Sequence, residues 1–491
     1  MKKILFWINS GTMSIFGLSK YLQDEIDGEF YAIYDIPEKP KKFFQEQKLV
    51  NFEKTWFYND FIETRKNIDY DYLKKFEENY KIDLWKLAST ERIFLYNEFY
   101  KFSTNEIYSI LETECRFYEN VINEIKPEYV IMVRPYFHHD MIFLQLCKAK
   151  GIKVLELELS RFPSRCTIGF GENRKKYDDF KIDKTIRNFD ELRAYRKRNS
   201  GFKQDVDYTN TKKDFFTAGL EYISSDNSTI KNNYKYFGRS KIKVLFNYIY
   251  DILRIRHRKN FLDKNFLKIV PNKKKYILFA LSVDAESGIL LDAPFHINQI
   301  EVVKNVVKSI PAEYTLLVKE HPASGVRSWR STQVYKELIN TPNVIPIHPT
   351  VNIDDLIKVS SLVISISSSS SLDALFYGKP SIIFSNTDFS MISDIKKLNE
   401  IEKLPLIIKN ELKREINSYS LEKYIQFIEK NSFEYDMVLH GQMMQKYLYH
   451  GSLLADVEIN DLDMKRFFEE TKNEFLKLKN AYLQIILKES C

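Results

Sequence analysis

A run of serine residues is the segment of this chain best suited to bind an anion. Five consecutive serines, Ser367–Ser371, follow the apolar segment Leu362–Ile366 and precede a helical pattern. Backbone N–H groups and hydroxyls at a helix start attract phosphate, because the helix dipole and the donors point at the same place. Serine is also an ordinary N-cap residue, which is the alternative. The length of the run favours phosphate binding, and the expected contacts are Ser367, Ser368, Ser369, Ser370 and Asp373.

A second polar segment, Lys319–Pro322, directly follows the apolar segment Thr315–Val318. Lysine and histidine at the end of a strand can face an anionic leaving group, and nearby guanidinium groups can bind phosphate oxygens through several donors. A surface loop with ordinary charges is the alternative. The residues expected at the anion are Lys319, Glu320, His321, Arg327 and Arg330, with His321 in a catalytic role.

Two carboxylates, Asp284 and Glu286, follow a third apolar segment at 276–281. Such groups can orient a sugar hydroxyl, act as a general base, or hold His321 in place. A capped turn is the simpler alternative. Of the two, Glu286 is the candidate for catalysis.

The elements that position these loops form a regular strand–helix alternation in the second half of the chain. Strands are predicted over 276–281, 315–318, 344–347, 362–366 and 381–384, and helices over 299–309, 329–338, 354–359 and 370–377. Short apolar strands between helices indicate an open parallel sheet of Rossmann type. Ligands bind such sheets at the carboxyl ends of the strands, where all three polar segments lie.

The first half of the chain repeats this alternation, with strands predicted over 4–8, 30–34, 129–133 and 153–159. Polar residues again follow two strands, and we expect them to border a cleft between the two halves: Ser10, Gly11, Thr12, Arg134, His138 and His139. His138 or His139 is suited to deprotonate a hydroxyl, because histidine titrates near neutral pH. A capping aspartate with two partly exposed histidines is an equally favoured interpretation.

Composition divides the chain into segments and excludes several classes of protein. We expect a Rossmann-like domain over 1–200, a helical insertion over 201–268, a second Rossmann-like domain over 269–421 and a helical tail over 422–491. The net charge of +7 over 491 residues is too small to indicate nucleic-acid binding. Four scattered cysteines and the lack of an 18-residue apolar stretch indicate a cytoplasmic protein without a spanning helix. No histidine–cysteine set has the spacing of a metal site.

One predicted helix of the insertion, Ser240–Arg258, has an apolar face ringed by lysine and arginine. A basic amphipathic helix of this kind can lie on an anionic membrane surface, and packing against a domain is the alternative. We expect the protein at the inner face of the cytoplasmic membrane if the first interpretation holds.

Segment 276–384 resembles the capsule polysaccharide biosynthesis family, which includes bacterial Kdo transferases. The matching motifs are LSVDAES at Leu281–Ser287, HINQ at His296–Gln299, LLVKEHP at Leu316–Pro322 and SSSSSLDALFYGKPSIIF at Ser367–Phe384. Asp373 stands where the family usually has glutamate. The resemblance implies a metal-independent glycosyltransferase of the GT-B type, without a cofactor. It also implies a nucleotide-sugar donor on the second domain and a glycan acceptor on the first.

The sequence therefore predicts a two-domain α/β protein of GT-B type that transfers sugar from a nucleotide-sugar to a growing bacterial surface polysaccharide. The acceptor is expected to be an oligosaccharide or lipid-linked. Two rivals remain: a polyol-phosphate transferase of the teichoic-acid type, and a non-catalytic glycan-assembly subunit that keeps the fold.

Overall fold

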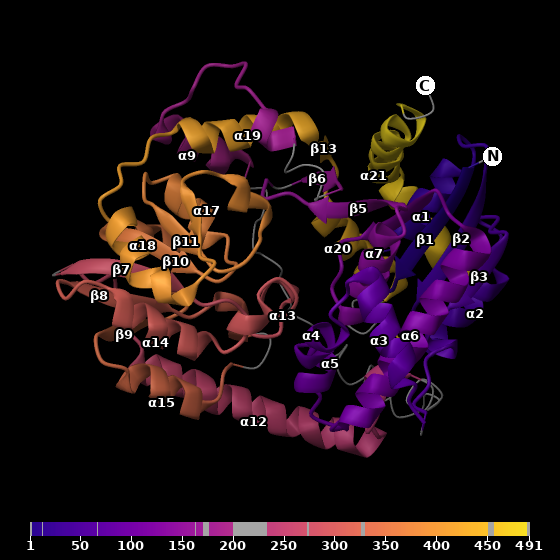
Figure 1. Cartoon of the computed structure of the whole chain (residues 1–491), viewed down its shortest axis with the longest axis horizontal. Helices are drawn as coiled ribbons and strands as arrows, with labels where there is room; N and C mark the ends of the chain where they lie inside the picture. Colours follow the sequence, from indigo (N-terminus) through magenta and orange to yellow (C-terminus); the bar gives the residue numbers. More distant parts are fainter. Residues whose placement is uncertain are drawn as a thin grey trace.

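The computed structural model describes residues 2–11, 13–65, 67–162, 164–169, 176–199, 233–272, 274–325, 329–449 and 456–488. They form two lobes that lie side by side (Figure 1). The helical insertion predicted over 201–268 is described only from residue 233 onward, so residues 201–232 of that prediction lie outside the described residues.

The first lobe is built on a seven-stranded sheet in the order β13-β6-β5-β4-β1-β2-β3. Its strands are β1 (Lys2–Asn9), β2 (Gly28–Asp35), β3 (Lys54–Phe57), β4 (Tyr129–Val133), β5 (Lys153–Leu159), β6 (Arg165–Ile168) and β13 (Phe433–Glu434). The strands β1 to β5 pair in parallel, whereas β6 pairs antiparallel with both β5 and β13. The order reverses between β1 and β4, which creates a crevice at the carboxyl ends of those strands.

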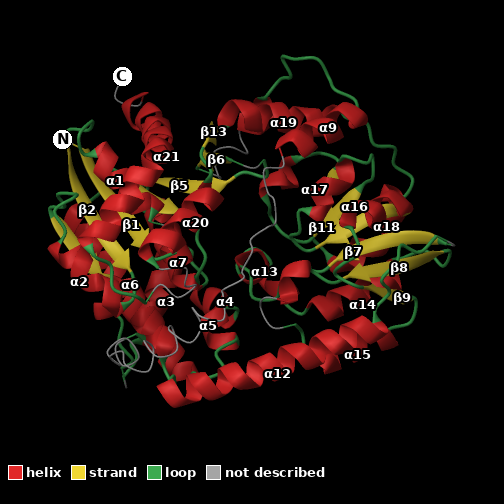
Figure 2. Cartoon of the chain, turned by 180° about the vertical axis from the view of Figure 1, so that it is seen from behind, coloured by secondary structure: helices red, strands yellow, loops and turns green. Residues whose placement is uncertain are grey.

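Helices cover both faces of this sheet. One face packs on α1 (Ser14–Leu22), α2 (Glu38–Glu46), α20 (Met437–Leu448) and α21 (Asp461–Lys488). The other face packs on α3 (Tyr70–Tyr80), α4 (Leu84–Ser89), α6 (Thr104–Ile125) and α7 (His138–Ala149), with the short α5 (Arg92–Leu95) nearby. The first strand and the last helix thus belong to the same lobe (Figure 2). A Cβ atom on Gly17 would lie 2.0 Å from the Phe475 ring, so only glycine allows α1 and α21 to pack this closely.

The second lobe contains a six-stranded, fully parallel sheet in the order β12-β11-β10-β7-β8-β9. Its strands are β7 (Lys275–Ala280), β8 (Tyr314–Lys319), β9 (Val344–Ile347), β10 (Ser360–Ser365), β11 (Ser381–Ile383) and β12 (Ile395–Lys397). Read along the chain, this is the 3-2-1-4-5-6 order of the Rossmann fold, with its switch point between β7 and β10.

Helices again lie on both faces of the second sheet. One face packs on α14 (Gln299–Ser309), α15 (Thr332–Asn340) and α18 (Leu404–Glu411). The other packs on α16 (Ile353–Val359), α17 (Ser370–Leu375), α19 (Tyr419–Asn431) and α9 (Phe189–Asn199). The short α13 (Ser287–Leu290) follows β7.

The predicted architecture, two Rossmann-type domains with a helical C-terminal segment, is confirmed. The helix predicted over 299–309 and the strand predicted over 344–347 have the observed bounds of α14 and β9. The predicted boundary at residue 421 falls within α19, which packs on the second lobe, whereas α20 and α21 return to the first.

A long helix, α12 (Lys241–Asn265), runs along the lower edge of both lobes (Figure 1). Its last turn packs into the second lobe through Leu262, which is buried beside Phe266. Within the described residues, no helix combines the length and apolar composition that crossing a bilayer requires.

Candidate active site

A cavity of about 470 Å³ lies where the crevices of the two sheets face each other. The second lobe contributes the loops that follow β7, β8, β10 and β11, and the first lobe contributes the ends of β4 and β5. The lining residues used below are Arg92, Arg134, Glu158, Arg161, Glu286, Asp292, His321, Ser367, Ser368 and Ser369. The cavity therefore combines the loops at the switch point of the second sheet with residues at the ends of β4 and β5 of the first.

The serine loop forms one wall of this cavity. Ser367, Ser368 and Ser369 line it, while Ser370 is buried with its Oγ 3.0 Å from that of Ser368. Behind the loop, the hydroxyl groups of Ser365 and Ser371 share a hydrogen bond of 2.8 Å. This bond joins the end of β10 to α17. The predicted loop thus places three hydroxyls at the cavity and uses the others to shape itself.

A glycine brings the neighbouring loop against these serines. A Cβ atom on Gly288 would lie 3.1 Å from the Oγ of Ser367, so a larger residue would push α13 away from the serine loop. Glu286, the residue before α13, lines the same cavity. The two loops at the switch point therefore enclose one small space.

His321 reaches the cavity from the loop after β8. Its Nδ1 accepts a hydrogen bond from the backbone N–H of Ala323 at 3.1 Å, so the neutral ring carries its proton on Nε2. Burial lowers the pKa of His321, although the charge of Glu286 opposes that shift. At neutral pH the ring is thus a neutral N–H donor.

The fully buried Glu320 holds this loop in place. Its carboxylate accepts from the backbone N–H of His321 at 2.7 Å, from the Ser324 hydroxyl at 3.0 Å, and from Arg330. Arg330 also donates to the backbone oxygen of Ser282, at the end of the neighbouring strand. Glu320 and Arg330 therefore position His321 instead of lining the cavity themselves.

Three further residues predicted at the donor are placed differently. Lys319 is buried, donates to the backbone oxygen of Pro349 at 3.1 Å and does not line the cavity; burial lowers its pKa to about 8. Asp373 pairs with Arg196 of α9 at 3.0 Å, and burial raises the pKa of Asp373 to about 6. Arg327 lies outside the described residues.

Arg134 and Arg161 of the first lobe both line the cavity, and the sequence predicted only the first of them. Arg134, expected on the acceptor side, lines the cavity and reaches across to Asp292 of the second lobe at 2.7 Å. Arg161 donates from Nε to Asp388 of the second lobe at 2.9 Å. These pairs join the lobes through the cavity wall.

Glu158, at the end of β5, is the main functional candidate that sequence reasoning missed. It lies beside Arg134 in the cavity wall, and burial raises its pKa to about 7 although Arg134 opposes that shift. A strand-end glutamate has no distinguishing motif, so only the fold reveals this environment.

His138 and His139 do not reach the cavity. Both side chains are completely buried at the start of α7, so neither the predicted general base nor the alternative of partly exposed histidines describes them. His138 lies between Glu91 at 2.9 Å and Glu114 at 3.2 Å. Burial opposes protonation, but these carboxylates raise the pKa of His138 to about 10.

His139 belongs to the same buried polar cluster. Its Nε2 lies 3.1 Å from Asp35, which also pairs with Lys235 at 2.6 Å. Ligand atoms of two sets of residues lie close enough together to hold a metal ion: Glu114, His138 and His139, and Asp35, His139 and Asp140. The ammonium of Lys235, 3.4 Å from Nε2 of His139, already supplies positive charge to the Asp35 side of the cluster.

The loop after β1 also stays outside the cavity lining. Ser10 accepts at its backbone oxygen from the Tyr449 hydroxyl at 2.7 Å, and Gly11 is exposed. Thr12 lies outside the described residues.

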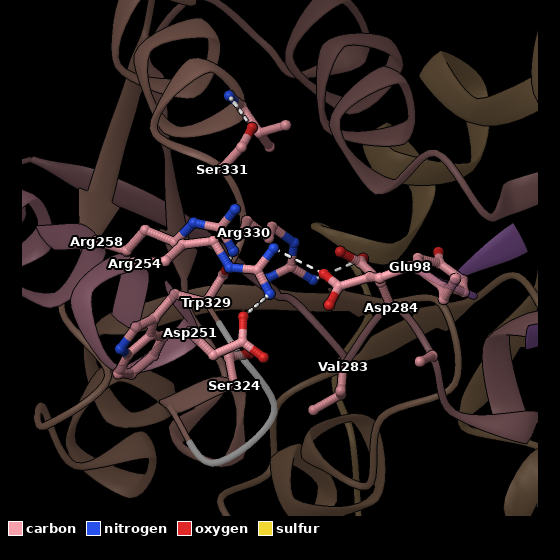
Figure 3. A pocket seen from close by; sticks show the side chains of 13 residues that line it. Glu98, Asp251, Arg254, Arg258, Val283, Asp284, Ser324, Trp329, Arg330 and Ser331 are labelled. Atoms are coloured by element: carbon pink, nitrogen blue, oxygen red, sulfur yellow. Dashed lines mark hydrogen bonds and ion pairs between the residues drawn. The ribbon is translucent and has the colours of Figure 1, made fainter. Parts of the chain in front are cut away.

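A second cavity, of about 430 Å³, shares the loop that follows β7 with the first as part of its wall (Figure 3). Residues of α12, of the segment after α5 and of the loops after β7 and β8 line it: Tyr96, Glu98, Asp251, Arg254, Arg258, Val283, Asp284, Ala285, Ser324, Trp329, Arg330, Ser331 and Val334. Whereas Ser282 and Glu286 of the β7 loop face the first cavity, Val283, Asp284 and Ala285 face the second.

The comparison with protein families agrees with the motifs. Residues 221–402 match the family described as "Capsule polysaccharide biosynthesis protein". This match contains every segment on which the resemblance rested and confirms it. No curated protein shows significant similarity to the chain.

Solved structures with related folds share little sequence with this chain. Thermosulfurimonas dismutans KpsC, a beta Kdo 2,7 transferase, is 13% identical over 71% of this chain and 98% of its own, with a TM-score of 0.28. The S. aureus MnaA–UDP structure is 14% identical over 93% and 99% of the two chains, with a TM-score of 0.27. Methanocaldococcus jannaschii UDP-GlcNAc 2-epimerase, bound to UDP-GlcNAc and UDP, is 13% identical over 88% and 100%, with a TM-score of 0.24.

Proposed function

We propose that the protein is a glycosyltransferase that moves a sugar from a nucleotide-sugar to an acceptor in the synthesis of a bacterial surface polysaccharide. The observation that carries this proposal is the single cavity that collects Ser367–Ser369 and His321 from strand ends of the second sheet and Arg134 from the end of β4 in the first. Hydroxyl, imidazole and guanidinium donors that converge in a crevice suit a nucleotide phosphate.

In this proposal the second lobe binds the leaving group. An acceptor hydroxyl attacks the anomeric carbon, the bond from that carbon to the phosphate oxygen breaks, and the electron pair leaves with the nucleotide. The serine hydroxyls and the Nε2–H of His321 then stabilise the growing negative charge, which preorganised donors do without reorganising. Lys319 contributes positive charge from its buried position at the end of β8. Glu320 and Arg330 hold the loop that follows this strand in place.

A carboxylate of the cavity accepts the proton of the attacking hydroxyl. Glu286 and Glu158 both line the cavity, and a general base works best when its pKa lies near the operating pH. Burial gives Glu158 such a value, about 7, so we assign this role to Glu158 and leave Glu286 to orient His321.

We also propose that the enzyme works at an anionic membrane surface. Four apolar side chains of α12 occur at i, i+4, i+7 and i+11 and are 57% to 70% exposed: Ile242, Phe246, Ile249 and Leu253. Exposed Lys243, Arg256 and Lys259 flank this stripe, whereas Arg254 and Arg258 line the second cavity. An apolar stripe flanked by cations suits the interface of an anionic bilayer.

The test is nucleotide-sugar turnover by the purified protein with and without His321→Ala. Loss of one preorganised donor lowers turnover by about 10²–10³-fold, and His296→Ala, a half-buried histidine outside the cavity lining, is the matched control.

Activity that survives a metal chelator supports the metal-independent mechanism. A phosphodiester product instead of a glycosidic one identifies the polyol-phosphate transferase, and no turnover of any donor identifies the assembly subunit.

A further inference from the structure

The second cavity brings three arginines together, but two of them are already neutralised. Arg254 donates to Glu98 at 2.7 Å and pairs with Asp251 one turn earlier on α12. Arg330 pairs with Glu320 and with Asp284, the latter at 2.9 Å.

Arg258 differs from both. It donates to the backbone oxygen of Trp329, and within the described residues no carboxylate forms an ion pair with it. Burial and the neighbouring charge of Arg254 lower the pKa of Arg258, and the charge of Glu98 offsets that shift only in part. Figure 3 shows Arg254, Arg258 and Arg330 gathered on one side of the cavity together with Asp251, which pairs with Arg254, and Glu98 and Asp284 on the other side. A guanidinium that no carboxylate of the described residues pairs with directly suits a small anionic ligand, although Glu98 attracts Arg258 at longer range.

The other lining groups suit a sugar. Glu98 and Asp284 offer carboxylate oxygens to sugar hydroxyls, and Ser324 and Ser331 offer hydroxyls. The exposed ring of Tyr96 adds an aromatic surface.

We propose that the second cavity binds an anionic sugar residue, bearing a carboxylate or a phosphate, through Arg258. This inference rests on the proposed function, because it makes the cavity a subsite for the acceptor glycan. The loop after β7 separates the two cavities, so a glycan whose end reacts at Glu158 extends past this loop into the second cavity. The subsite would select acceptors by charge before transfer.

The test is calorimetric titration of the full chain with glucuronate, glucose 6-phosphate, glucose and inorganic phosphate, in the absence of a donor. The wild-type protein should bind at least one anionic sugar and not glucose. Arg258→Gln should weaken that binding by roughly 10–100-fold, the loss expected for a charge-assisted hydrogen bond. Arg258→Lys should restore part of it. Arg256→Gln removes the same charge from the exposed face of α12 and is the matched control.

The outcomes are distinct. Tighter binding of glucuronate or of glucose 6-phosphate identifies the anionic group as a carboxylate or a phosphate. Equal affinity of the Arg258→Gln and Arg256→Gln proteins, binding of inorganic phosphate as tight as that of any sugar, or no binding of an anionic sugar overturns the proposal. Because no donor is present, these results are independent of whether the protein transfers sugar.

Discussion

At the residue scale, His321 and Glu158 approach one cavity from opposite lobes with opposite shifts in pKa. Burial lowers the pKa of His321 and raises that of Glu158, so at neutral pH the histidine is a neutral donor and the glutamate holds a proton more readily than an exposed one, although Arg134 opposes that shift. This is the protonation pattern that stabilising a leaving phosphate and deprotonating an acceptor require.

Replacing Glu158 with glutamine tests its role as the base. A base must be deprotonated, so wild-type kcat/KM should rise with pH through about 7, the pKa of Glu158. In Glu158→Gln this rising limb should vanish and kcat/KM should fall by about 10²–10⁴-fold. If the kcat/KM of Glu158→Gln still rises with pH through about 7, Glu158 is not the base, and Glu286 becomes the candidate.

The sequence predicted some of these residues and not others for a physical reason. His321 and Ser368 follow apolar strands directly, and the carboxyl end of a parallel strand is a recognisable position. The environments of His138 and Glu158 depend on partners far away in the chain, Glu91 and Arg134 among them. A single sequence gives no sign of such pairings, and neither interpretation of the two histidines, as a general base or as partly exposed residues, anticipates their complete burial.

At the element scale, α12 presents two different faces. Its inner face carries Arg254 and Arg258 to the second cavity, while its outer face exposes the stripe that includes Phe246 and Leu253. The sequence predicted the apolar face of this helix and the cations around it, but it placed all of the arginines beside that face. Which arginines instead point into the second cavity depends on where the two lobes lie.

The membrane proposal predicts that the protein sediments with anionic vesicles and not with vesicles of neutral lipid. Binding should weaken at 1 M salt, where the screening length falls to about 3 Å. Phe246→Ser combined with Leu253→Ser should abolish it, because each substitution removes a large exposed side chain from the stripe. Leu462→Ser, an equally exposed leucine on α21, should leave binding unchanged. If the wild-type protein does not sediment with anionic vesicles at low salt, the proposal is refuted.

The regular alternation between residues 276 and 384 allowed five strands and four helices to be predicted to within about three residues, whereas β12, α13 and α18 were not predicted. In the first lobe, β13 escaped prediction because it contributes only two residues, Phe433–Glu434, to a sheet whose other strands precede residue 170. A strand this short leaves no periodic pattern in the sequence.

At the scale of the whole molecule, ion pairs across the cavity join the two lobes. Arg134 bridges Glu158 and Asp292, and Arg161 reaches Asp388. Sequence patterns predicted the two lobes but not these pairs, because which loops face each other depends on the packing of complete domains.

Asp292→Asn should loosen this arrangement. Arg134 would lose its charged partner on the second lobe, so the radius of gyration from X-ray scattering should increase. Misplacing the reacting groups should lower transfer by up to about 10²-fold. Asp71→Asn, on the exposed surface of the first lobe, is the control, and unchanged scattering with unchanged transfer would show that the pair does not hold the lobes together.

The central claim is that the serine loop binds the phosphate of a nucleotide. Calorimetric titration with CMP, UDP, GDP and CDP, for the wild-type protein and for Ser368→Ala combined with Ser369→Ala, tests it most directly. We predict that one of these nucleotides binds the wild-type protein. The double variant should bind it roughly tenfold or more weakly while unfolding at the same temperature. A folded double variant with undiminished affinity, or a wild-type protein that binds none of the four, would contradict the claim.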